Sequence, residues 1–317
     1  MKIILSGSLA IDQIMSFSGS FSELIQKDHL DKISFSVLVE KLTRSNGGIA
    51  GNIAYSLAAL GEKPVLLVSA GKDAEAYIDK LNKIGVDTSL VHFSQLPTAT
   101  FSVLNDGKEN QIGGFYEGAM SDADSLNFSQ FATEKENIFA VISAHNPQAM
   151  ARQVQECQTF AIKLLYDPGQ QITNLAANDL AAGIEAASIL ILNEYEMSLL
   201  AQKINLSAEE IIAKTDLCII TLGKNGAKFY EKSNNHQEQL ISGVKLGKVL
   251  DPTGAGDAFR AGFLYAYAHA WKTATAVELA CIVASFAVQE NGTQNHQLDW
   301  SKIKQRYEET YDKRLQN

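Results

Sequence analysis

The chain has few cysteines, and it lacks both closely spaced pairs of histidines and long apolar runs. Its 317 residues include 3 cysteines, Cys157, Cys218 and Cys281, with no CxxC spacing, which predicts reduced, buried thiols. None of the 6 histidines forms an HExxH pair, so a structural zinc site is not expected. No apolar run reaches the ~20 residues that span a bilayer, and the N-terminal stretch meets Ser6 and Asp12 too early for a signal peptide. We therefore expect a cytoplasmic protein without membrane contacts.

Positive charge is also sparse. The chain has 27 lysines and arginines against 36 aspartates and glutamates, which gives a net charge of −9, and no basic cluster stands out. Because nucleic acids are held by basic surfaces, nucleic-acid binding is not expected. An anionic ligand would instead need a local site of backbone N–H groups.

The length and the hydrophobic content of 46% favour one large α/β domain over residues 1–317. Short runs rich in isoleucine, leucine and valine alternate with segments of helical spacing. The predicted strands are 65–70, 139–143, 160–166, 188–193 and 217–223, and the predicted helices include 52–61, 74–85, 194–204, two within 253–290 and one near 299–312. This alternation predicts a mainly parallel central sheet with helices on both faces. Ligands bind beyond the carboxyl ends of such strands, near Asp167, Asn193, Thr221 and Gly223.

Two regions, 12–45 and 98–118, break this alternation. Their segments IDQIMSF, KISFSVLV, TATFSVLN and QIGGFY alternate polar and apolar residues, with a turn signal at Asp106-Gly107. They predict a small antiparallel sheet, which would be marginal alone and therefore packs over a ligand as a lid.

The stretch DPTGAGD, residues 251–257, directly precedes an apolar helical run. Free N–H groups at a helix start form an anion site, and glycines let a phosphate approach the backbone. The loop is neither a Walker A sequence nor a dinucleotide fingerprint, because GxxxxGK[ST] is absent and Phe259 replaces the third glycine. Asp257 can take a proton from a hydroxyl while the N–H groups of Gly254, Ala255 and Gly256 stabilise a transferring phosphoryl group. The alternative is that Asp257 only stabilises the helix start.

DPTGAGDAFRAGF resembles the C-terminal signature of the ribokinase-like, or PfkB, family of carbohydrate and nucleoside kinases. Four further segments resemble that family's motifs in order: GSLAID (7–12), NGGIAGN (46–52), NEYE (193–196) and TLGKNG (221–226). The resemblance covers essentially the whole chain and implies a three-layer ribokinase-like fold with a β lid. Four segments are similar to bacterial adenosine kinases of the actinobacterial type: the opening stretch from GSLAIDQIMSF to KISFSVLV (7–39), FYEGAMS (115–121), DPGQQ (167–171) and GTQ (292–294).

This resemblance implies transfer of the ATP γ-phosphoryl group to the 5′-hydroxyl of adenosine, giving AMP and ADP. Asp257 would be the general base, and Gly254, Ala255 and Gly256 the anion hole. Another acceptor (inosine, guanosine, ribose or fructose) and a catalytically silent binding protein are the alternatives. A homodimer through the lid is a further hypothesis, because Ile33, Phe35 and Val37 give its outer face a partly apolar character.

The resemblance also implies binding residues. For the acceptor they are Ser8, Asp12, Ser36, Gly47, Gly48, Asn52, Phe101 and Phe115; for ATP they are Asn193, Glu196, Thr221, Gly223 and Gly226. Asp12 would hold the sugar diol, the two phenylalanines would wall the base, and Glu196 would organise Mg²⁺ through water. Structural readings stay open, since Asn52 can start a helix, the phenylalanines can be lid packing, and Glu196 can be a surface charge. Asp251 either shapes the loop or belongs to a K⁺ site, and Arg260 either touches phosphate or braces the loop.

Overall fold

The computed structural model describes residues 1–25, 34–108 and 110–315. A central sheet of eight strands has the order β14-β13-β12-β11-β10-β9-β1-β4. Its strands are β1 (Lys2–Ser6), β4 (Val65–Leu67), β9 (Ile138–Ser143), β10 (Leu164–Asp167), β11 (Ile189–Asn193), β12 (Leu217–Thr221), β13 (Gly226–Glu231) and β14 (Gln239–Ser242). The strands from β4 to β12 run parallel, and β13 and β14 close one edge antiparallel. The mainly parallel sheet predicted from the sequence is confirmed.

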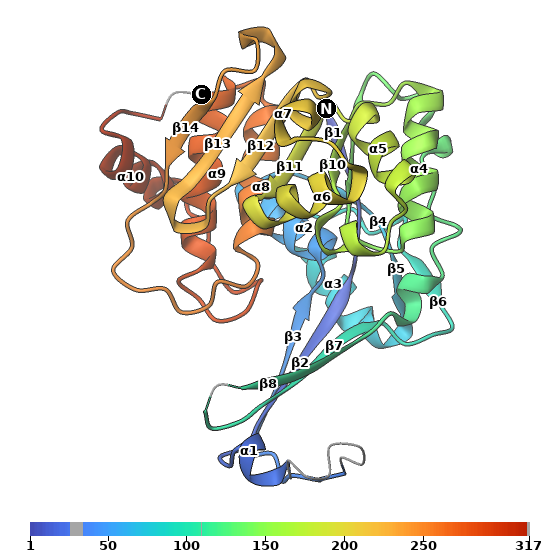
Figure 1. Ribbon diagram of the computed structural model, residues 1–317, viewed down its shortest axis with the longest axis vertical. Helices are drawn as coiled ribbons and strands as arrows, with labels where there is room; N and C mark the ends of the chain where they lie inside the picture. Colours follow the sequence, from blue (N-terminus) through green and yellow to red (C-terminus); the bar gives the residue numbers. More distant parts are fainter. Residues whose placement is uncertain (26–33, 109, 316–317) are drawn as a thin grey trace.

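Helices cover both faces of this sheet (Figure 1). One face carries α2 (Ile49–Leu60), α3 (Glu75–Lys83), α8 (Ala255–Ala268), α9 (Thr273–Ala287) and α10 (Trp300–Tyr311), and the other carries α4 (Pro147–Phe160), α5 (Ala177–Ala186), α6 (Glu194–Ile204) and α7 (Ala208–Ala213). Strand side chains alternate between two cores: Leu5 and Ile191 join the first, and Ile4 and Leu192 the second. Both cores are fully buried at these positions, which fixes the sheet as the middle of three layers.

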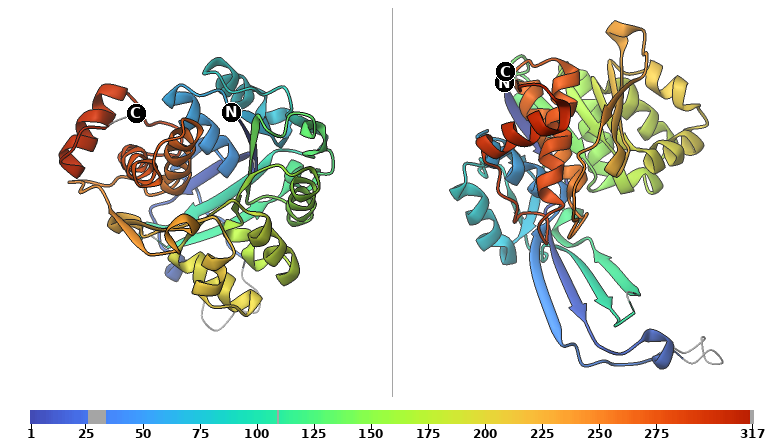
Figure 2. Two further views of the ribbon diagram at one scale, coloured as in Figure 1. Left: turned by 90° about the horizontal axis from the view of Figure 1, so that it is seen from above. Right: turned by 90° about the vertical axis from the view of Figure 1, so that its left-hand side faces the viewer.

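The lid projects from one end of the main domain as a separate four-stranded sheet (Figures 1 and 2). Its order is β3 (Lys41–Gly47), β2 (Ala10–Ser16), β7 (Ala99–Asn105), β8 (Gln111–Tyr116), and the short helix α1 (Phe21–Leu24) lies at its tip. The outer pairings are antiparallel as predicted, but β2 and β7 are parallel. Both strands leave the main domain in the same direction, so the lid is a mixed sheet (Figure 1).

Three sequence-based element boundaries were wrong. Residues 34–39 of KISFSVLV form no strand, and Lys32 and Ile33 lie outside the described residues. Strand β2 pairs with β3 on one side and with β7 on the other, so no side of β2 is left for residues 34–39. The edge strand of the lid is β3 instead. The predicted strand 65–70 is split into β4 and β5 (Ser69–Gly71), which pairs with β6 (His92–Ser94). The strand predicted from residue 160 starts at Leu164, because α4 continues to Phe160.

Within the described part of the chain, none of the helices combines the length and the apolar character needed to cross a bilayer.

Candidate active site

The start of α8 places Asp257 close to the base of the lid. Gly254 precedes the helix in the left-handed region with a φ of 78°, and a Cβ there would lie 2.9 Å from the side chain of Thr293. Only glycine fits this close approach without strain. Asp257 then lies in the first turn of the helix, where the dipole favours a carboxylate.

The backbone N–H groups of this turn are only partly used. The Ala255 N–H faces the Pro252 carbonyl at 3.2 Å. Among the hydrogen bonds of the described residues, none uses the N–H of Gly254, Gly256 or Asp257. The anion hole expected from Gly254, Ala255 and Gly256 stays a prediction; in the described part of the structure the Gly254 and Gly256 N–H groups are unpaired, as is that of Asp257, whereas the Ala255 N–H is engaged. Such unpaired groups at a helix start can hold a phosphoryl group.

Asp257 has the environment of a general base that works near neutral pH. Burial raises the pKa of its carboxyl to about 6, although Arg260 and a hydrogen bond from Asn52 oppose this rise. The Asn52 Nδ2 donates to Asp257 Oδ2 at 2.7 Å, which leaves Oδ1 for an incoming hydroxyl. A carboxylate with a pKa close to the working pH is effective at proton abstraction.

Asp12 lies on the lid strand that faces Asp257. Burial and then the charge of Asp251 raise the pKa of Asp12 to about 6. In the sheet register Asp12 is opposite Phe101, which is opposite Phe115, so these three side chains share one face of the lid. The phenylalanines are 39% and 52% exposed, and their rings are free to receive a planar ligand beside Asp12.

The glycines at the end of β3 allow this close packing. A Cβ on Gly47 would lie 2.5 Å from Asp12 Oδ2, and Gly48, with a φ of 85°, would place one 2.6 Å from the Ser8 carbonyl. The Ser8 hydroxyl accepts the Ile49 N–H at 3.0 Å, so it helps to start α2. Ser36 is exposed in the segment before β3 and makes no side-chain hydrogen bond with the described residues. The structure does not bring Ser36 to Asp257, and its substrate role stays a prediction.

The predicted nucleotide residues lie at the ends of neighbouring strands. Asn193 ends β11 and is paired in register with Thr221 at the end of β12. Asn193 and Glu196 form a capping box at α6: Oδ1 accepts the Glu196 N–H and Glu196 Oε2 accepts the Asn193 N–H, both at 2.8 Å. Gly223 and Gly226 have φ values of 57° and 100° in the following turn, and Gly223 borders open space. The NxxE spacing is itself a readable capping signal, which the sequence analysis missed.

Arg260 braces the start of α8 against the central sheet. Its Nε and Nη2 each approach a carboxylate oxygen of Asp167, at the end of β10, at 2.6 Å, and both residues are buried. Burial raises the pKa of Asp167, and the guanidinium opposes this by favouring the carboxylate. This buried ion pair, in which Nη2 donates a hydrogen bond to Oδ1, gives Arg260 the bracing role that the sequence left open.

Asp251 shapes the same loop. Its two carboxylate oxygens accept the N–H groups of Thr253 and Gly292, each at 2.9 Å. The loop-shaping alternative is therefore satisfied, and the K⁺ alternative stays a prediction. In the described ranges no group of three or more histidine, cysteine or acidic side chains is arranged to hold a metal ion.

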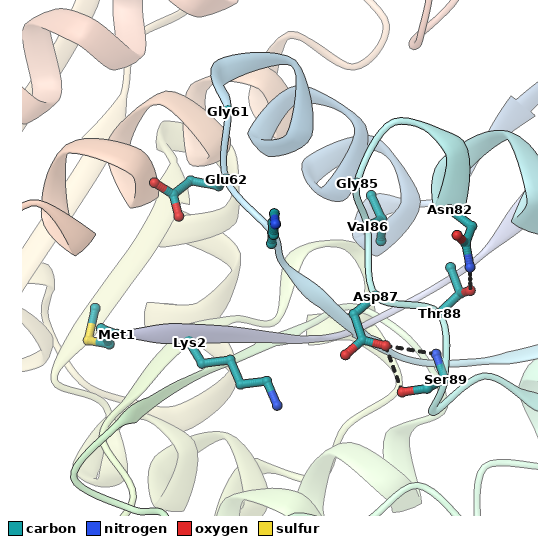
Figure 3. A pocket seen from close by; sticks show the side chains of 11 residues that line it. Met1, Lys2, Gly61, Glu62, Asn82, Gly85, Val86, Asp87, Thr88 and Ser89 are labelled. Atoms are coloured by element: carbon teal, nitrogen blue, oxygen red, sulfur yellow. Dashed lines mark hydrogen bonds between the residues drawn. The ribbon is translucent and has the colours of Figure 1, made fainter.

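A further hollow lies elsewhere. It has a volume of about 980 Å³ and lies beyond the amino ends of β1 and β4. Met1, Lys2, Glu62, Asp87 and Ser89 are among its lining residues (Figure 3). Parallel sheets bind ligands at their carboxyl ends, so this hollow is not the candidate site.

The chain is also similar to known proteins. Residues 17–300 match the model of the pfkB family carbohydrate kinases. A nucleoside kinase of Methanocaldococcus jannaschii is 28% identical over 276 residues, which cover 86% of this chain and 89% of that protein. The structure of Burkholderia thailandensis nucleoside kinase in complex with inosine has a TM-score of 0.85 and 30% identity, with 99% of this chain and 100% of that chain covered. Its complex with ADP-inosine gives a TM-score of 0.82 at 32% identity, with 100% and 98% covered.

Proposed function

The chain belongs to the pfkB family of carbohydrate kinases, and on this premise we propose that it transfers the γ-phosphoryl group of ATP to the 5′-hydroxyl of a nucleoside. One observation carries the proposal: a half-buried carboxylate with one unused oxygen adjoins unpaired N–H groups on the same helical turn. Both groups are needed for phosphoryl transfer to an alcohol. The likeness to nucleoside kinases, one of them bound to inosine, supports a nucleoside as the acceptor.

In the proposed reaction Asp257 Oδ1 takes the proton of the 5′-hydroxyl. The N–H groups of Gly254, Gly256 and Asp257 stabilise the negative charge of the transferring group. Asp12 accepts hydrogen bonds from the two ribose hydroxyls. The nucleotide lies against Asn193, Thr221, Gly223 and Gly226, and Glu196 Oε1, which the capping box leaves unused, faces the water shell of Mg²⁺. Magnesium keeps much of its hydration, and it supplies charge neutralisation on the phosphates.

The aromatic face of the lid favours a purine nucleoside over a free sugar. Phe101 and Phe115 present exposed rings beside Asp12, and a base can stack on them. Stacking tolerates every base, so it does not separate adenosine from inosine. We propose adenosine as the preferred acceptor, on the sequence resemblance, with inosine as the second candidate.

A panel of acceptors tests this proposal. With Mg·ATP, we expect kcat/KM for adenosine or inosine to exceed that for ribose by about 5- to 150-fold, because one stacked base contributes about 1–3 kcal/mol. Initial rates of ADP formation with adenosine, inosine, guanosine, ribose and fructose measure this. Faster turnover of ribose or fructose would rule out a nucleoside as the acceptor, and no turnover with any of the five would favour a binding protein.

We propose, secondly, a homodimer through the outer face of the lid. Of the residues first suggested, Ile33 lies outside the described residues, and Phe35 and Val37 belong to no strand of the lid sheet. The register instead aligns Leu42, Met15, Leu104 and Ile112 in one apolar row on the face opposite Asp12. Leu42 and Ile112 are 53% and 48% exposed in the single chain, an apolar surface that a second lid would cover.

Sedimentation velocity tests the dimer. At micromolar concentration the chain should sediment as a dimer, and Leu42→Glu combined with Ile112→Glu should shift it to a monomer. A wild-type monomer at that concentration would contradict the proposal.

A further inference from the structure

Tyr77 and Gln294, to which no motif gives a role, link the lid to Asp257. The Tyr77 hydroxyl donates to the Gly47 carbonyl at 2.9 Å. Gln294 Nε2 donates to the Tyr77 oxygen at 2.5 Å and to Asn52 Oδ1 at 2.9 Å. Asn52 Nδ2 then donates to Asp257 Oδ2 at 2.7 Å. Tyr77, Gln294 and Asn52 are each at most 5% exposed, so water does not compete for these bonds.

The direction of every hydrogen bond in this relay is fixed by its two ends. A carbonyl only accepts, so the single Tyr77 proton is used on Gly47 and the Tyr77 oxygen can only accept from Gln294. Gln294 must therefore present its NH₂, whose second hydrogen reaches Asn52. Asn52 must in turn present its oxygen to Gln294 and its NH₂ to the carboxylate. The network thus selects one of the two amide orientations of Asn52.

Resting on the proposed function, we propose that Tyr77 and Gln294 are positioning residues, which fix the Asn52 amide so that Asp257 presents Oδ1 to the acceptor hydroxyl. The reversed amide would place the Asn52 oxygen against the carboxylate, which repels it. The relay begins at Gly47, whose Cα lies beside Asp12 Oδ2, so it also ties the orientation of the base to the sugar-binding end of lid strand β3.

The relay acts on Asp257 within a crowded charge environment. The carboxyl is faced by Arg260 of α8, Asp12 of β2, Glu196 of α6, Asp167 at the end of β10 and Tyr77 of α3. Loss of the ordered Asn52 donor leaves these groups in place. It removes one influence that lowers the pKa of Asp257, so that pKa should rise further.

Tyr77→Phe, compared with Tyr55→Phe, tests the relay. Tyr55 offers a matched control, because its hydroxyl donates at 2.9 Å to the carbonyl of His296, two residues beyond Gln294, and lies outside the relay. We expect Tyr77→Phe to lower kcat about tenfold, the value of a hydrogen bond to a charged group, with little change in the nucleoside KM. The acid limb of its kcat/KM profile should move to higher pH. Tyr55→Phe should leave kcat and the profile unchanged.

A second readout does not depend on turnover. In ¹⁵N-labelled protein the Asn52 side-chain amide signals should shift with pH as Asp257 titrates, and Asp257→Asn should abolish that shift. Tyr77→Phe and Gln294→Met should weaken the shift and speed amide exchange, while Tyr55→Phe should not. Equal behaviour of Tyr77→Phe and Tyr55→Phe in both kinetics and spectra would overturn the relay. If the wild type phosphorylates no acceptor, the proposed function fails, and the spectra alone decide the relay.

Discussion

Asp257→Asn should lower kcat by about 10²–10⁴-fold, the usual contribution of a general base. The amide keeps the size of the carboxyl group and its oxygen still accepts the hydrogen bond from Asn52 Nδ2, but it cannot take the 5′-hydroxyl proton. The nucleoside KM should change little, because Asp12 and the lid still bind the sugar and the base. Steady-state ADP formation at saturating Mg·ATP measures both constants, and a variant that retains more than a tenth of the wild-type kcat would exclude Asp257 as the base.

The free energy of unfolding of Asp257→Asn provides the control for its loss of activity. Burial raises the pKa of Asp257 to about 6, so the folded protein binds this proton more tightly than the unfolded chain does. The stability that this group contributes is present at low pH and is lost as the pH rises through 6. At pH 8 the ionised carboxylate therefore destabilises the fold, and Asp257→Asn should raise the free energy of unfolding by about 1–3 kcal/mol. Urea titrations should show this gain shrinking towards pH 4, and a loss of stability at pH 8 would mean that the substitution damages the fold.

Arg260→Leu should lower the free energy of unfolding by about 3–5 kcal/mol. The substitution leaves the Asp167 carboxylate, 1% exposed, without its cationic partner in the interior. It also frees the start of α8 from the end of β10, so phosphoryl transfer should fall as well. Urea unfolding at pH 8 gives the stability change.

Two comparisons make this result specific to the buried pair. Asp167→Leu combined with Arg260→Leu removes both charges and should recover much of the stability lost in Arg260→Leu. Lys232→Met breaks the exposed Lys232–Asp216 pair, whose side chains are 70% and 65% exposed, and should cost less than about 1 kcal/mol. A double variant as unstable as the sum of its single variants would contradict the burial argument.

Local periodicity predicted the parallel strands β9 to β12 and the helices α2, α3 and α6, but not the antiparallel edge strands β13 and β14. Each strand–helix repeat carries its own pattern, and the predicted helix 194–204 has the bounds of α6 because the Asn193 and Glu196 side chains cap it. Residues 34–39 were wrongly predicted as a lid strand, because they alternate polar and apolar residues as a strand does. Which segment pairs with β2 depends instead on the packing of the whole lid sheet. Periodicity does not specify which of two competing segments pairs.

The candidate site was predictable only where its residues belong to short motifs. Asp257 and Gly254 follow from a helix start and a tight turn, and Asp12 was implied by the resemblance of GSLAID (7–12) to a family motif. The Arg260–Asp167 pair joins positions 93 residues apart, and the Gln294–Tyr77 contact spans 217 residues. Such contacts depend on how the layers pack. The GTQ motif (292–294) contains Gln294, but neither this motif nor Tyr77 carries a local signal of a hydrogen-bond relay.

The identity of the phosphorylated product tests the central claim most directly. ³¹P NMR of Mg·ATP with adenosine or inosine, beside 5′-deoxyadenosine and Asp257→Asn, follows both products at once. The proposed function predicts equal amounts of ADP and nucleoside 5′-monophosphate from the wild type, and neither from the 5′-deoxy analogue or the variant. A nucleoside phosphorylated at another hydroxyl, or ADP accompanied only by inorganic phosphate, would contradict the proposed function.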